Sequence, residues 1–198
     1  MDLLQLFKVL VMQEFSFLQK KYGFDFSKES DHRFTAKSSR CLVAIDFDKN
    51  VIGCWIERLD LPQKHPDRGI GVGWIAQYFG FRDDEIRFLT REESITQQTK
   101  SLANQLREYC KEFLLGNFSQ WEDIKEFVRK QIEIEEEKEK EQSLQRLVSD
   151  VRYDAETAWK DKNYGKVIDQ LEIIEEFLTP SEREKLEYAK RHVSSEQE

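Results

Sequence analysis

The stretch RCLVAIDFDKNVIGCWIERL, residues 40–59, is the part of the chain that decides the fold. Two apolar runs flank the polar sequence Asp48-Lys49-Asn50, a pattern typical of two antiparallel strands joined by a tight turn. Both runs carry apolar residues on part of each face, so we expect this to be the most buried strand pair of its sheet. A hairpin is not stable alone in water, so other strands and helices must cover it.

The segments before the hairpin predict a helix and two short strands. Apolar residues in the range Leu3–Lys21 follow helical spacing, and Gly23 is placed to end the helix. Phe24 and Phe26 alternate with polar residues, and residues 32–37 repeat this alternation. The sequence therefore predicts an α+β fold: an N-terminal helix on a three- to four-stranded antiparallel sheet, followed by helices and a helical C-terminal extension.

The segment that follows the hairpin, residues 60–73, interrupts the regular pattern. It contains two prolines and three glycines at alternate positions, Gly69, Gly71 and Gly73. A phosphate-binding loop requires a different glycine spacing and a Gly-Lys-Ser/Thr ending, so we interpret the segment as an irregular connection. Residues 72–79 then predict a short helix.

Capping boxes mark the later helices, because each has a Thr or Ser followed three residues later by a Glu. Thr90–Glu93 opens a helix expected to end near Leu115, and Ser119–Glu122 opens the next. This second helix loses its apolar stripe in the sequence EIEEEKEKEQ, residues 133–142. The pattern leaves open whether residues 119–160 form one continuous helix or two broken ones.

The loss of the apolar stripe predicts a domain boundary near residue 138. An α+β domain is expected over residues 1–138 and a helical arm over residues 139–198. The stripe resumes at Leu144, and a turn at residues 161–163 predicts a helix-turn-helix hairpin. The sequence Thr179-Pro180-Ser181-Glu182 begins the final helix, because it combines a capping box with proline at the first helical position.

Composition argues against a nucleic-acid or membrane partner and for a cytoplasmic protein. The formal net charge is −8 and the isoelectric point is about 5.2, so a duplex or an anionic membrane surface would repel the chain on average. The N-terminal apolar segment is interrupted by charged residues and lacks the pattern of a signal peptide. Cys41, Cys54 and Cys110 lie in apolar runs, so we expect buried free thiols.

The residue pattern indicates no metal, cofactor or catalytic site. The three histidines are widely separated, and none has a Cys or a second His within ligand spacing. The three cysteines occupy predicted core positions instead of a turn or a helix start. The alternative is a small hydrolase-like or ligand-binding enzyme that uses the 60–73 loop, with His65, Asp67 or the acidic pair Asp83-Asp84 as its polar groups.

Two stretches resemble a loosely defined set of uncharacterised bacterial α+β proteins. They are FLQKKYGFDF, residues 17–26, and LANQLREYCKEFLLGNFSQW, residues 102–121. The resemblance covers about residues 1–125. Some small proteins of this shape are immunity partners of bacterial toxins, so the resemblance implies a binding role of the immunity or adaptor type. It indicates no catalytic residue.

The range Val151–Val193 resembles a single tetratricopeptide repeat, in which a Tyr after the turn lies between two helices. Asp154 and Ile174 depart from the repeat pattern, where a leucine and an alanine are usual. A solenoid needs about three repeats to bury its faces, so one hairpin implies a packing element or a docking surface. The residues that match the repeat spacing are Ala155, Asn163, Tyr164, Val167 and Leu171.

We therefore expect a non-enzymatic protein-protein interaction module that binds a protein partner through its helical arm. Trp159 and Tyr164 are the candidate anchors, because large aromatic side chains dominate the energetics of protein interfaces. The alternative for both residues is packing between the helices of the arm itself. Self-association as a homodimer through the C-terminal helices is left open by the sequence.

Overall fold

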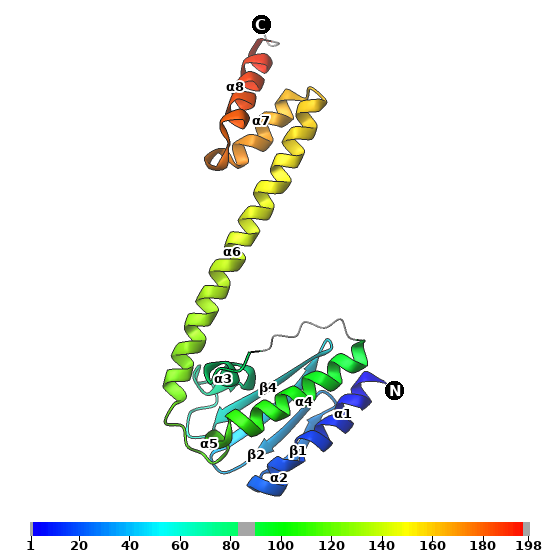
Figure 1. Ribbon diagram of the computed structural model, residues 1–198, viewed down its shortest axis with the longest axis vertical. Helices are drawn as coiled ribbons and strands as arrows, with labels where there is room; N and C mark the ends of the chain where they lie inside the picture. The colour runs from blue at the N-terminus through cyan, green and yellow to red at the C-terminus, as the bar shows by residue number, and fades with distance from the viewer. Residues whose placement is uncertain (1, 83–89, 196–198) are drawn as a thin grey trace. The chain divides into compact units, whose positions relative to one another are not determined.

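The computed structural model describes residues 2–82 and 90–195, and its contacts divide the chain into two compact units (Figure 1). We refer to Met1–Lys130 as the N-terminal unit and to Gln131–Glu198 as the C-terminal unit. The helix α6, Trp121–Lys160, is continuous and belongs to both units. Residues 121–160 therefore form one continuous helix and not two broken ones. The predicted domain boundary at residue 138 lies within α6.

The N-terminal unit contains a five-stranded antiparallel sheet in the order β1-β2-β3-β4-β5, which confirms the predicted α+β class. The sheet has one strand more than expected, because Gly69–Gly71 pairs with β4. This strand holds a single apolar residue between two glycines, which is too short for its alternation to be read from sequence. The strands are β1 (Asp25–Ser30), β2 (Arg33–Lys37), β3 (Cys41–Asp48), β4 (Val51–Arg58) and β5 (Gly69–Gly71).

The predicted hairpin is confirmed in β3 and β4. Lys49 and Asn50 form its two-residue turn with φ angles of 46° and 71°, the positive values that a turn matching the strand twist requires. The burial is uneven between the two faces of this pair, because one face of β4 exposes Val51 by 63% and Trp55 by 39%. The opposite face is buried, and its residues are Cys41, Val43, Ile45, Phe47, Ile52, Cys54 and Ile56.

Helices of the N-terminal unit form one hydrophobic core with the sheet. The predicted first helix is broken at Phe15 into two helices, and Gly23, with a φ of 69°, ends the second. The capping box at Thr90 and Glu93 is confirmed, but its helix ends at Tyr109 and a short helix continues to Leu114. The helices are α1 (Leu3–Glu14), α2 (Ser16–Tyr22), α3 (Val72–Tyr78), α4 (Arg91–Tyr109) and α5 (Lys111–Leu114).

The C-terminal unit is helical and has a separate core built from three helices and a 3-10 turn. The later part of α6 contributes, with α7 (Tyr164–Ile173), η1 (Glu175–Phe177) and α8 (Pro180–Ser195). Asn163 accepts a hydrogen bond from the backbone N–H of Lys166 and so caps α7 after the predicted turn. The core residues are Val148, Val151, Ala155, Ala158, Val167, Leu171, Ile174, Leu178, Leu186 and Ala189.

Candidate functional site

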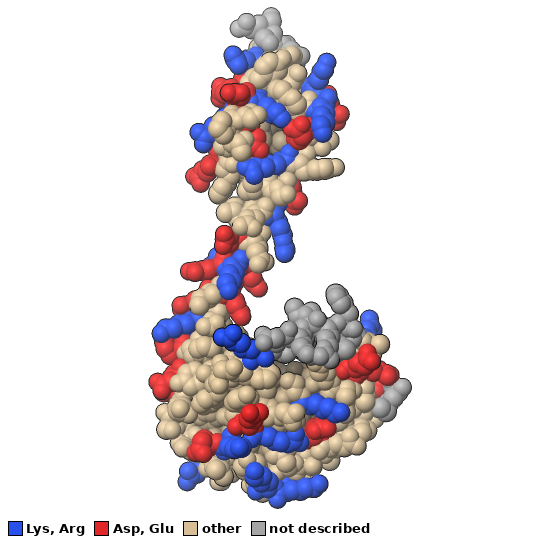
Figure 2. Space-filling view, in the orientation of Figure 1, with Lys and Arg blue, Asp and Glu red and all other residues tan. Residues whose placement is uncertain are grey.

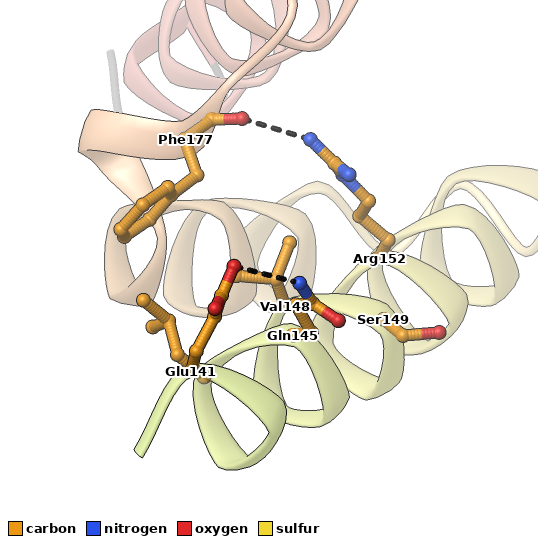
Figure 3. A pocket seen from close by; sticks show the side chains of 7 residues that line it. Glu141, Gln145, Val148, Ser149, Arg152 and Phe177 are labelled. Atoms are coloured by element: carbon orange, nitrogen blue, oxygen red, sulfur yellow. Dashed lines mark hydrogen bonds between the residues drawn. The ribbon is translucent and has the colours of Figure 1, made fainter. Parts of the chain in front are cut away.

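The C-terminal unit has a groove between α6 and η1, with a volume of about 490 Å³ (Figure 3). Its α6 residues recur at intervals of three and four, which places them on one face of the helix. Phe177 of η1 completes the lining. The full lining is Glu141, Leu144, Gln145, Val148, Ser149, Arg152 and Phe177.

Three apolar side chains form the apolar part of the groove lining. Val148 is 9% exposed and belongs to the core of the unit, whereas Leu144 and Phe177 are 40% and 45% exposed. Apolar side chains that stay exposed around a groove are typical of sites that bind another molecule. The remaining lining residues are polar or charged, so the groove has an apolar centre and a polar rim.

Arg152 positions Phe177 at the groove. Its Nη2 donates a hydrogen bond of 2.8 Å to the carbonyl oxygen of Phe177 (Figure 3). Its Nε lies 2.8 Å from Oε1 of Glu182. The same Glu182 carboxylate accepts from the backbone N–H of Thr179 at 2.7 Å, which confirms the predicted capping box of α8. Arg152 therefore fixes η1 and the start of α8 against α6.

The pKa of the Glu182 carboxyl reflects this network. Desolvation by burial raises its pKa, but hydrogen bonds from Thr179 and Arg152 together outweigh that effect and leave the pKa below its ordinary value. Glu182 is therefore ionised at neutral pH and holds Arg152 by charge as well as by hydrogen bonding.

The two aromatic residues selected from the sequence lie in the C-terminal unit but not in the groove. Trp159 and Tyr164 meet edge to face at 5.7 Å, and each also contacts Tyr188 of α8. Lys185 lies over the Trp159 ring at 5.5 Å. Both rings are half-buried and connect the α6–α7 turn to α8, so they pack within the unit. Their role in binding stays a prediction.

The 60–73 loop, the site of the alternative enzyme hypothesis, is held by ionic and hydrogen bonds. Asp67 lies 3.4 Å from both Lys125 and Arg129, and its carbonyl oxygen accepts from Nε1 of Trp121 at 2.8 Å. His65 Nδ1 accepts from the backbone N–H of Asp67. Although desolvation opposes the effect, the two cations hold the pKa of Asp67 below its usual value. The pair Asp83-Asp84 lies outside the described residues.

The hollow next to this loop has a volume of about 290 Å³ and contains neither His65 nor Asp67. It is lined in part by Asp60, whose carboxylate lies 2.6 Å from the Arg58 guanidinium. This hydrogen bond holds the pKa of Asp60 below its usual value, so the group stays ionised and is poorly suited to act as a general acid at neutral pH.

The cysteines and the metal-ligating residue types provide no chemical site in the part of the chain that the structure describes. Cys41, Cys54 and Cys110 are buried and free, as predicted. Burial raises the pKa of each thiol, which disfavours the reactive thiolate. Over residues 2–82 and 90–195, no group of three His, Cys, Asp or Glu side chains is placed to hold a metal ion.

The sequence indicated the α6 side of the groove only as an apolar helical stripe, and it did not indicate the groove itself. Leu144 and Val148 belong to the apolar stripe that resumes after the charged segment. Phe177 was missed because it lies outside the helical period of α7 and follows two glutamates. The one available signal was an aromatic residue located between a predicted helix and a predicted capping box.

None of the described helices is long and apolar enough to cross a membrane. Comparison of the chain with models of known protein families, with curated proteins and with solved structures finds no match.

Proposed function

We propose that this protein is a non-enzymatic binding module that recognises a protein partner through the groove of its C-terminal unit. The observation that carries the proposal is the exposure of Leu144 and Phe177 beside a groove of about 490 Å³. The groove lies within the helical arm, residues 139–198, where the sequence predicts partner binding.

The lining chemistry supports binding over catalysis. Arg152 is engaged by Glu182 and by the carbonyl of Phe177, and Ser149 has no histidine or lysine beside it in the lining. What the groove offers is an apolar surface with a fixed shape, and an apolar side chain of a partner would gain free energy by leaving water there.

Affinity capture from native cell extract, followed by mass spectrometry, tests the proposal with two matched variants of the full chain. Leu144→Ser removes an exposed leucine from the groove. Leu147→Ser removes a leucine of similar exposure, 48%, that does not line the groove. We expect Leu144→Ser to lose the partner and Leu147→Ser to keep it, because only the first contributes to the apolar surface of the groove.

Both leucines are largely exposed, so neither variant should change the midpoint of thermal unfolding by more than about 2 °C. Capture that survives Leu144→Ser, or that is lost equally in both variants, would contradict recognition through the groove.

A further inference from the structure

We propose that the groove takes a cationic amphipathic helix, in which apolar residues are flanked by Lys or Arg. This inference rests on the proposed function and specifies the chemistry of the partner. It comes from the face of α6 that continues beyond the groove and from the charges on that face.

The groove-lining face of α6 extends one and a half turns or more toward the N-terminus of the helix. Ile134, Glu137, Glu141, Leu144 and Val148 follow one another at intervals of three and four residues, so they share this face. At 1.5 Å per residue the track is roughly 21 Å long, which matches about four turns of a partner helix. Ile134 is 42% exposed, so apolar contacts are available near both ends with two glutamates between them.

Acidic residues strongly outnumber basic residues in the C-terminal unit. Residues 131–198 contain 19 acidic and 11 basic residues, whereas residues 1–130 contain 20 of each, so the net charge of −8 resides in the C-terminal unit. Figure 2 shows acidic side chains along the middle of α6, with basic side chains among them. A second copy of this chain would bring like charges together at this face, whereas a basic partner would complement it.

The six glutamates between residues 133 and 141 outnumber the two lysines among them, Lys138 and Lys140, by four. The ion pairs that i,i+3 and i,i+4 spacing predicts here, such as Glu136 with Lys140, are not formed, and in the described residues none of these six glutamates has an ion-pair partner. Glu141 accepts only a hydrogen bond from Gln145, at 3.4 Å (Figure 3).

The one cation in the groove lining does not neutralise this rim. Arg152 forms an ion pair with Glu182 and donates from Nη2 to the Phe177 carbonyl, while its buried Nε has no hydrogen-bond partner among the described residues. The same face also carries Lys138, four residues after Ile134 and three before Glu141, so Glu137 and Glu141 leave this stretch with a net charge of −1. Lys or Arg side chains of a partner helix would lie against Glu137 and Glu141.

Fluorescence anisotropy with synthetic helical peptides tests the inference on the full-length protein. One peptide of about 18 residues carries leucines at i, i+3, i+4 and i+7 with lysines beside them; a second carries glutamates in place of the lysines. We expect the lysine peptide to bind and the glutamate peptide to bind at least about tenfold more weakly. Binding should weaken as salt rises from 0.05 to 0.5 M, because the charges are exposed and screened.

Two double variants provide the decisive comparison. Glu137→Gln with Glu141→Gln removes two charges from the groove-lining face, and we expect affinity for the lysine peptide to fall about fivefold. Glu135→Gln with Glu139→Gln removes two charges from the opposite face of the same helix, and affinity should change less than about twofold. Leu144→Ser should abolish specific binding.

The outcomes separate this inference from the proposed function. Equal binding of both peptides that still depends on Leu144 overturns the cationic partner and leaves groove binding intact. Equal sensitivity to both glutamate pairs indicates general charge attraction and overturns the inference. A dimer in sedimentation experiments that Leu144→Ser dissociates identifies a second copy as the occupant and overturns it as well. Affinity capture of a partner that is unchanged in the Leu144→Ser variant contradicts the proposed function itself.

Discussion

Trp55 lies across the backbone of Gly53 on the exposed face of β4, and this arrangement depends on the missing side chain at residue 53. A Cβ atom built at Gly53 would lie inside the indole ring of Trp55. Gly69, in the neighbouring strand, has more room, because the nearest atom to its Cβ position is Cγ of Glu57 at 3.5 Å. A side chain at residue 53 would therefore displace the Trp55 ring, whereas a methyl group at residue 69 would fit, although both glycines lie in strands of one sheet.

Gly53→Ala should destabilise the N-terminal unit by about 1–3 kcal/mol, because the Trp55 ring must leave its packed position. Gly69→Ala is the matched control and should change the free energy of unfolding by less than about 1 kcal/mol, since its methyl group makes ordinary van der Waals contact and reduces the entropy of the unfolded chain. Urea unfolding followed by tryptophan fluorescence measures both. Equal effects of the two variants would exclude ring displacement as the cause.

At the scale of elements, the link between η1, α8 and α6 depends on Arg152 and Glu182. These two residues are separated by 30 positions in the sequence, and their ion pair joins the start of α8 to a turn of α6. The same carboxylate completes the capping box with Thr179. One ionised group thus stabilises a helix start and a tertiary contact.

Glu182→Gln should lower the stability of the C-terminal unit by about 1–2 kcal/mol at pH 7. The folded-state pKa of Glu182 is below its unfolded value, so its contribution is present above about pH 4.5 and is lost as pH falls through the folded pKa. The difference between the wild type and Glu182→Gln should therefore shrink in acid. Urea unfolding followed by circular dichroism at pH 7 and about pH 3.5 measures it.

Glu184→Gln provides the control for that comparison, because it removes the same charge from the same helix. Glu184 is exposed, whereas Glu182 is partly buried. It should have little effect at either pH. A Glu182→Gln protein that is as stable as the Glu184→Gln protein at pH 7 would show that the Arg152–Glu182 pair does not hold η1 in place.

For the molecule as a whole, the hydrophobic cores are separate. One core draws on residues of the N-terminal unit, including Trp121 and Ile124 at the start of α6. The other draws on residues from Val148 to Ala189. The C-terminal core is small, and small cores bury too little surface to give much stability, so we expect this unit to unfold first.

Leu171→Ala should lower only the unfolding transition of the C-terminal unit, and Leu106→Ala only that of the N-terminal unit, each by about 2–5 kcal/mol, because both leucines are at most 2% exposed. Hydrogen–deuterium exchange under increasing urea resolves the two transitions. Residues 132–143 should exchange fastest within α6, since their side chains contribute to neither core. A single cooperative transition in both variants would contradict independent cores.

The sequence by itself determined the local elements: the hairpin and its turn, the capping boxes at Thr90 and Thr179, the turn at residues 161–163 and the α+β class. Each depends on residues near one another in the chain, where periodicity and backbone preference act directly. Only the tertiary structure decided which face of the hairpin is covered, that Gly69–Gly71 pairs with β4, and that Phe177 meets Leu144 and Val148 at a groove. Those outcomes depend on contacts between distant segments, and the Arg152–Phe177 hydrogen bond across 25 residues shows why: many pairings satisfy the same local pattern, and packing of the whole unit selects one.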